Sequence, residues 1–261
     1  MFPRRFTRLA CAAALTSLAS LAPLSAQAAP TPAAMISATW GAATTVSGDL
    51  DILTTGTLVY AYNFGGTSVA GETVNGVSFS PWGVAPSTST QTVGSVTLSE
   101  TPGRLQPTSS TGSIATPFSS LSTAYQGLLS NAIKADQPAT MTLLLGGLTI
   151  GQTYSLQLWS SDSSGNNTTV TTVTGTATVN LDANTTDVAG GLGQYVIGTF
   201  TASAATMRLT LASSGADNPL IDALQLRTYA PAAVPLPATL ALLLAALPLM
   251  AAVGTRARSR D

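Results

Sequence analysis

TYSLQLWS (Thr153–Ser160) is one of the two clearest strand patterns in the later part of the sequence. Polar and apolar side chains alternate along it, and it contains aromatic residues, which is typical of a β-strand with one face in a core. A second such run, ATMTLLL (Ala139–Leu145), lies before it, and Gly146, Gly147 and Gly151 fall between the two. The glycines predict a turn, so this part of the chain is expected to form two strands.

Similar short runs follow each other on both sides of this stretch. Thr169–Leu181 is rich in Thr and Val and is broken at Gly175, which predicts a hairpin or a bent strand. Asn75-Gly76 predicts a bulge or tight turn inside another run. The remaining predicted strands are 36–40, 57–64, 73–79, 93–98, 195–201, 207–212 and 220–227. Many short strands separated by turn signals predict a mainly β protein, an antiparallel β-sandwich with a jelly-roll-like arrangement.

One segment has a helical period instead. Apolar residues recur there at intervals of three and four: Leu121, Tyr125, Leu128, Leu129 and Ile133. The pattern predicts one short amphipathic helix of about 14 residues, with Ser119 or Ser120 as its N-cap. The stretches 80–91 and 101–117 are rich in Pro, Gly, Ser and Thr, and they are predicted to be loops.

The beginning of the chain has the pattern of a secretory signal peptide, residues 1–28. Arg4, Arg5 and Arg8 precede an apolar run from Leu9 to Leu24. Ala26-Gln27-Ala28 then forms an A-x-A cleavage site, so Ala29 is the expected first mature residue. Signal peptidase and the Sec export machinery are therefore expected partners.

The exported part, residues 29–230, lacks the residue types that most catalytic sites use. The chain has no histidine, and its one cysteine, Cys11, lies in the signal peptide. A histidine-based triad, a thiol nucleophile and a disulfide framework are thereby excluded. Four basic and ten acidic residues between Ala29 and Ala233 give a net charge of about −6, which disfavours a nucleic-acid partner.

The end of the chain, residues 231–261, has three parts in a fixed order. VPLPA (Val234, Pro235, Leu236, Pro237, Ala238) comes first, and the two prolines hold it extended. An uncharged apolar run then continues to Val253, long enough for a transmembrane helix. Arg256, Arg258 and Arg260 follow, and they predict a tail on the cytoplasmic side of the inner membrane.

This order of motif, span and basic tail resembles the PEP-CTERM sorting signal of Gram-negative bacteria, in its VPLPA variant. Leu236 stands where the commoner form of the motif has Glu. The resemblance implies an exosortase-type membrane protease as a partner, which cleaves near the motif and releases or re-attaches the exported domain. A plain membrane anchor is the alternative.

The exported domain also resembles galactose-binding-type jelly rolls. GQTYSLQLW (Gly151–Trp159) matches their G-x-x-Y-x-L-x-L strand, and IDALQL (Ile221–Leu226) matches their closing I-D-x-L-x-L strand. The resemblance implies a fold rather than a ligand, and it implies that a structural calcium ion is common.

Two oxygen-rich loops are candidates for such a calcium ion, the one cofactor considered. One loop holds Asp162 with its Ser and Asn neighbours, and the other holds Asp182, Asn184 and Asp187. Carboxylate and amide oxygens are the ligands that Ca²⁺ prefers. The same residues are also ordinary turn formers, which is the alternative explanation.

Carbohydrate chemistry suggests two further candidates. Trp82, in a Pro/Gly-rich segment, is predicted to be an exposed platform for a sugar ring, whereas Trp159, Tyr60 and Tyr62 are expected in the core. Carboxylate pairs that could flank a glycosidic bond are Asp49 with Asp51 and Glu72 with Glu100.

Taken together, these features predict an exported cell-surface or matrix protein that is structural or adhesive rather than catalytic. The alternatives are a carbohydrate-binding module for exopolysaccharide and a polysaccharide-active enzyme.

Overall fold

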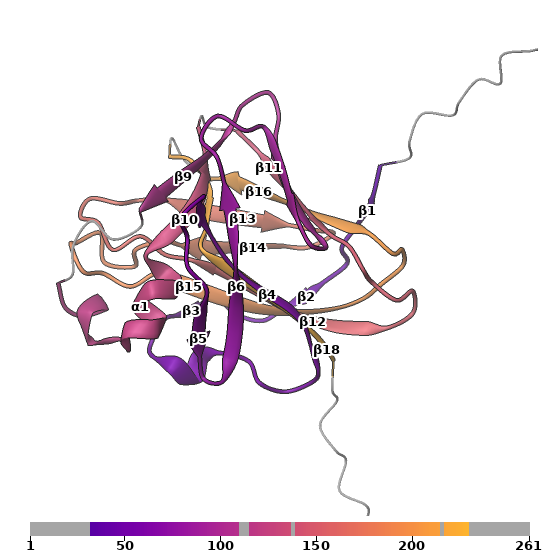
Figure 1. Ribbon diagram of the computed structural model, residues 1–261, viewed down its shortest axis with the longest axis horizontal. Helices are drawn as coiled ribbons and strands as arrows, with labels where there is room; N and C mark the ends of the chain where they lie inside the picture. The colour runs from indigo at the N-terminus through magenta and orange to yellow at the C-terminus, as the bar shows by residue number, and fades with distance from the viewer. Residues whose placement is uncertain (1–31, 110–114, 137–138, 215–216, 230–261) are drawn as a thin grey trace, which may run out of the picture. The chain divides into compact units, whose positions relative to one another are not determined.

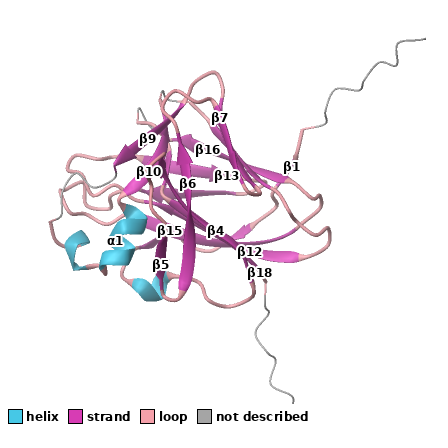
Figure 2. Cartoon of the chain, viewed as in Figure 1, coloured by secondary structure: helices cyan, strands magenta, loops and turns pink. Residues whose placement is uncertain are grey.

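A computed structural model describes residues 32–109, 115–136, 139–214 and 217–229. Within these ranges the regular structure is mainly β-strand, with one α-helix, as predicted (Figures 1 and 2). No helix of this part is long and apolar enough to cross a membrane. The predicted signal peptide and the predicted C-terminal sorting signal lie outside the described residues.

The first large sheet contains the strand Met141–Leu145 (β11) near its centre. The strand order is β14-β13-β16-β11-β8-β7, with the short β1 beside β16. Its other members are β1 (Ala34–Met35), β7 (Thr90–Val93), β8 (Val96–Glu100), β13 (Val170–Thr174), β14 (Thr178–Asp182) and β16 (Met207–Ser213). β13 and β14 form the predicted hairpin around Gly175.

The second large sheet is built around Thr153–Ser160 (β12), which pairs with a neighbour on each side over most of its length. The strand order is β2-β15-β12-β18-β4-β6-β5, and β3 also pairs with β15. The other strands are β2 (Thr39–Trp40), β3 (Thr44–Thr45), β4 (Leu58–Gly66), β5 (Glu72–Val74), β6 (Val77–Val84), β15 (Gln194–Thr201) and β18 (Ala223–Thr228).

A third sheet of three strands has the order β17-β10-β9. Its strands are β9 (Leu105–Ser109), β10 (Asn131–Ala135) and β17 (Leu220–Ile221). Ile133 and Ala135 of β10 join the main core. The alternate residues Ala132 and Lys134 lie on the opposite face of the strand, so this face is available for another role.

The two large sheets share one hydrophobic core, as the layers of a β-sandwich do. Leu143, Leu209 and Leu98 contribute to this core from the first sheet, and Leu156 and Leu224 contribute from the second. Alternation along β12 and β18 directs every second side chain into this core. The layered arrangement explains why the strands that the sequence marked most clearly are the central ones.

Details of the sheets differ from the prediction. β4 and β6 run parallel, and so do β1 and β16, so the sheets are not purely antiparallel. β6 also continues through the predicted loop as far as Val84. Pro81 is tolerated there because it lies beyond the part of β6 that pairs with β5, which ends at Phe79. The Asn75-Gly76 turn is as expected, since both residues have positive φ, 48° and 74°.

The helix is shorter than predicted. α1 spans Thr123–Leu129, and its N-cap is Ser122, whose Oγ accepts a hydrogen bond from the amide of Tyr125. A 3-10 turn, Phe118–Ser120 (η2), occupies the predicted N-cap positions, and Ile133 lies on β10 instead. The helical period runs on from α1 into β10 because the apolar residues of both are buried. Those of α1 lie in the second hydrophobic cluster, and Ile133 of β10 lies in the main core.

α1 packs on the second large sheet, on the face turned away from the main core. Leu128 and Tyr125 lie there against Trp159 of β12 and Phe79 of β6 in a second hydrophobic cluster. The indole Nε1 of Trp159 donates to Tyr125 Oη at 3.0 Å. Tyr125 Oη in turn donates to Asp51 at 3.2 Å. The helix is thus fixed to the sheet by both apolar contact and a buried chain of hydrogen bonds.

Next to this cluster, the same face of the sheet is polar although it is buried. Gln157, Gln225 and Arg227 lie side by side on β12 and β18 and are at most 7% exposed. The segment that covers them is residues 51–56, called here the covering loop. Gln157 donates to the carbonyl of Asp51 at 2.7 Å and accepts from the amide of Leu53 at 2.9 Å. The polar face therefore holds the loop through its main chain.

Candidate functional site

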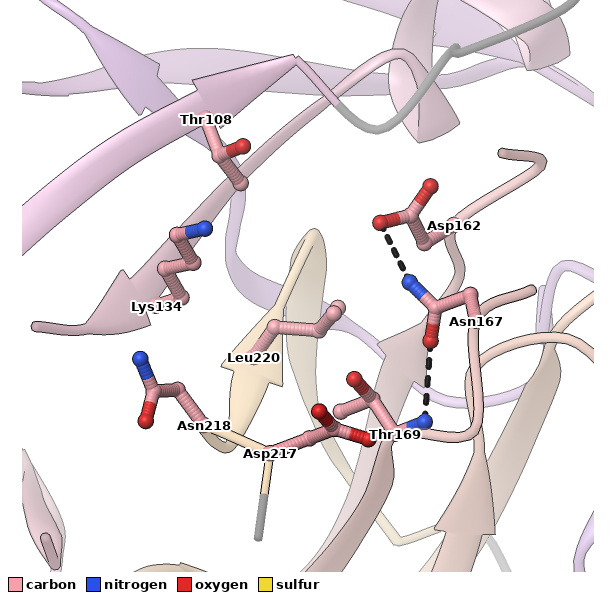
Figure 3. Close-up of a pocket in the computed structure, with 8 residues that line it drawn as sticks. All are labelled: Thr108, Lys134, Asp162, Asn167, Thr169, Asp217, Asn218 and Leu220. Atoms are coloured by element: carbon pink, nitrogen blue, oxygen red, sulfur yellow. Dashed lines mark hydrogen bonds between the residues drawn. The ribbon is translucent and has the colours of Figure 1, made fainter. Parts of the chain in front are cut away.

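A polar pocket of about 240 Å³ lies on the outer face of the three-stranded sheet (Figure 3). Thr108 of β9, Lys134 of β10 and Leu220 of β17 form one side, because β10 pairs with both neighbouring strands. The remaining lining residues come from the loops before β13 and before β17: Asp162, Asn167, Thr169, Asp217 and Asn218. Seven of the eight lining residues are polar or charged, so the pocket suits a ligand rich in hydrogen-bonding groups.

The wall formed by the loop before β13 is rigidified by its own hydrogen bonds. Asp162 Oδ1 accepts from the amide of Ser164 at 2.9 Å and from its hydroxyl at 2.6 Å, while Asp162 Oδ2 accepts from Asn167 Nδ2 at 2.6 Å. Asn167 Oδ1 accepts from the amide of Thr169 at 2.9 Å. Figure 3 shows the two bonds of Asn167 in sequence along this wall. Both oxygens of Asp162 are thereby used within the loop.

Asp217 and Asn218 line the pocket from the segment before β17. Asp217 Oδ2 accepts from Thr168 Oγ1 at 2.7 Å, which ties this segment to the loop before β13. Asn218 is half-buried and can offer both donor and acceptor groups to a ligand. Lys134 gives the pocket one positive charge, and Asp162 and Asp217 give it two negative charges.

Of the predicted site residues, Asp162 and its neighbour Asn167 line the pocket. Lys134 and Asn218 were not predicted, since the pocket residues lie on segments far apart in the chain. One signal for Lys134 was present: it is one of only four basic residues in the predicted exported domain, and it lies between residues of a buried strand. The pairing of β9, β10 and β17 that creates the pocket could not be seen in the sequence.

Hydrogen bonds engage the side chains of Asp182 and Asn184 in the second predicted calcium loop. The Nδ2 group of Asn184 donates to the carbonyls of Ser164 and Val188 at 2.8 and 2.9 Å. Its Oδ1 accepts from the amide and hydroxyl of Thr186, and Asp182 Oδ1 accepts from the amide of Asn184. Asp187 is exposed. Within the described residues no group of three acidic, His or Cys side chains gathers as a metal site.

Trp82 is not an exposed platform, and that prediction was wrong. It lies on β6 with none of its surface exposed, packs against Phe64 at a centroid distance of 4.9 Å and donates Nε1 to the carbonyl of Val96. The Pro and Gly residues around it suggested a loop, but the strand continues through them. Trp159 is buried, as expected, and Tyr60 and Tyr62 pack against the main core.

The carboxylate pairs that could flank a glycosidic bond lie outside the pocket lining. Asp49 and Asp51 lie in a 3-10 turn, Asp49–Asp51 (η1), where they accept hydrogen bonds from Ser122 and from Ser47. Glu72 belongs to β5 in the second large sheet, whereas Glu100 ends β8 in the first. The hydrogen bonds of Asp49 and Asp51 are thus local, and none of the four residues is on the pocket wall.

Glu100 instead faces a different carboxylate, Asp136. Its Oε2 accepts from the amide of Asp136 at 3.3 Å, while Oε1 is buried and has no hydrogen-bond partner. A Cβ added to Gly103 would lie 2.1 Å from Glu100 Oε1 and 2.6 Å from Asp136 Oδ1, so both groups face one small space. Burial raises the pKa of Glu100 to about 7, and the negative charge of Asp136 adds to this rise, against the hydrogen bond from the Asp136 amide.

The comparisons with known proteins identify no family. No family model matches the chain, and no curated protein matches it. Among solved structures, the chain aligns with one described as "Structural basis for the promiscuous specificity of the carbohydrate-binding modules from the beta-sandwich super family". The identity is 15%, the alignment covers 74% of this chain and 99% of that one, and the TM-score is 0.17. The pocket itself is therefore the feature of this chain that bears on function.

Proposed function

We propose that this protein is an exported, non-catalytic component of the cell surface or extracellular matrix whose jelly-roll-like domain binds carbohydrate in the polar pocket. The observation that carries the binding is the lining of the pocket. Hydroxyl, amide, ammonium and carboxylate groups converge on about 240 Å³, less than the roughly 300–1,000 Å³ typical of drug-sized ligands. One sugar unit, with its ring of hydroxyl donors and acceptors, fits such a lining.

A non-catalytic role agrees with the state of the pocket's carboxylates. Glycoside hydrolysis uses two carboxyl groups, one of which must give a proton to the leaving oxygen. Both oxygens of Asp162 already accept hydrogen bonds from Ser164 and Asn167, and Asp217 accepts one from Thr168. These bonds suit side chains that shape a binding surface.

Binding is tested by replacing Asn218 with leucine in the purified full chain. The change removes an amide from the pocket wall and puts an apolar group in its place, so we expect affinity for a bound oligosaccharide to fall at least about tenfold. Titration calorimetry against a panel of neutral and acidic oligosaccharides measures it. Asn180→Leu, at an exposed position on β14 outside the pocket, is the control and is expected to bind normally. Equal affinities for the two variants would place binding elsewhere.

The route to the surface is proposed from the two ends of the chain. Signal peptidase would cut after Ala28, and an exosortase-type protease would cut near Val234–Ala238 once the apolar run is in the inner membrane. Mass spectrometry of the protein from its own cells is expected to find a mature C-terminus at or near this motif. Recovery of chains that end at Asp261 would instead indicate a plain membrane anchor.

A further inference from the structure

The ammonium group of Lys134 lines the pocket without a counter-ion. Lys134 is half-buried on β10, where its backbone is fixed by pairing to Gln106 of β9 and to Leu220 of β17. Within the described part of the chain, no hydrogen bond or ion pair reaches its Nζ. Because its ammonium group lines the pocket and has no partner among the described residues, a ligand with the opposite charge can pair with it there.

Neither carboxylate of the pocket supplies the opposite charge to Lys134. Asp162 is directed to Ser164 and Asn167, and Asp217 is directed to Thr168. Figure 3 shows Lys134 and Asp162 on opposite walls of the pocket. The hydrogen bonds of the loops thus engage the acidic side chains, and the basic side chain remains available to a ligand.

Because the positive and negative side chains lie on different walls, the pocket favours one orientation of a charged ligand. An anionic group on the ligand is attracted at the Lys134 wall and repelled at the walls with Asp162 and Asp217. The neutral groups of Thr108, Thr169 and Asn218 can then bond to hydroxyls around it.

We propose that the pocket recognises a sugar unit that carries a carboxylate, a uronic acid, with the carboxylate paired to Lys134 and the hydroxyls bonded to the neutral side chains. This rests on the proposed function, and it narrows the ligand to one chemical class. Because an ion pair in a partly exposed site is screened by salt, the preference for the acidic sugar should decrease as ionic strength rises.

The test compares matched sugars. Galacturonate and glucuronate oligomers, their neutral methyl esters, and galactose and glucose oligomers are titrated into the purified full chain by calorimetry. The wild type is expected to prefer the acids about tenfold over the esters. Lys134→Gln should lose this preference while keeping its affinity for the neutral esters, and Lys134→Arg should keep the preference. Arg104→Gln, which removes a charge from an exposed position outside the pocket, should behave as the wild type. Thermal melts confirm that each variant is folded.

The outcomes separate this inference from the proposed function. Equal affinity of the wild type for acids, esters and neutral oligomers would overturn the uronic acid and leave carbohydrate binding intact. A preference that survives in Lys134→Gln would also overturn it. Absence of binding to every sugar would overturn both. Competition by acetate or sulfate alone, at the same concentrations as the uronates, would show a general anion site and reject the sugar class.

Discussion

Replacing Arg227 with methionine is expected to lower the free energy of unfolding by about 2–4 kcal/mol, the largest effect of any single change on the polar face of the second sheet. Arg227 Nε donates to the carbonyl of Thr55 at 2.9 Å, and its Nη2 donates to the carbonyls of Thr54 and Gly56 at 2.9 and 2.8 Å. Methionine fills similar space but donates nothing.

Two effects oppose each other in this change. Burial of the guanidinium lowers the pKa of Arg227, which shows that its charge is held at a cost, and removing the charge relieves that cost. The loss of hydrogen bonds is larger than the gain from removing the buried charge, because three carbonyls of the covering loop and Gln225 Oε1 all lose their donor. A hydrogen bond to a charged group contributes about 1.5–3 kcal/mol.

Urea unfolding measures the loss, and hydrogen exchange locates it. The amide of Thr57, which donates to Thr228 Oγ1 at the end of the covering loop, should exchange faster in Arg227→Met. Arg208→Met is the matched control, since Arg208 Nε makes one hydrogen bond, to the carbonyl of Ala33, and its loss should cost less than about 1 kcal/mol. If the two variants are equally stable, the loop does not depend on Arg227.

The second large effect is a dependence of stability on pH. Glu100 has an ordinary pKa of 4.5 and a pKa of about 7 in the folded protein. Between these values the folded chain binds a proton that the unfolded chain releases, so stability falls as pH rises from about 4.5 to 7 and stays low above that range. A rise of this size corresponds to roughly 3–4 kcal/mol.

Glu100→Gln isolates this contribution, because glutamine resembles the protonated acid. The variant is expected to be more stable than the wild type at pH 8 and similar to it at pH 5, as measured by urea unfolding at both values. Asp136→Asn should reduce the same slope, since it removes the neighbouring negative charge. A wild-type slope that persists unchanged in Glu100→Gln would assign it to another group.

How much of the fold follows from the sequence depends on what each segment contacts. β12 was predicted to the residue, because its alternation reflects one core face and neighbours on both sides. The strand predicted at 220–227 is instead divided between β17, which pairs with β10, and β18, which pairs with β12. β9 and the end of β6 were predicted as loops. Both contain proline, and both become strands only through pairing with distant segments, Asn131–Ala135 and Leu58–Gly66. Local pattern cannot report such partners.

The site was predictable to a smaller extent for the same reason. Asp162 was singled out because acidic and amide residues gather around it in the sequence, and it does line the pocket. Lys134 and Thr108 reach the pocket only because β10 and β9 are paired. Trp82 was misplaced because its neighbours suggested a loop, although its burial follows from the strand that contains it.

The way in which the covering loop is held has an evolutionary consequence. Gln157, Gln225 and Arg227 bind its carbonyls and amide, whereas the side chains of Thr54 and Thr55 are exposed and take no part. Recognition through the main chain is indifferent to side-chain identity. Positions 54 and 55 can therefore accumulate substitutions, whereas Ile52, which is buried in the second cluster, and Gly56, with a positive φ of 80°, are constrained.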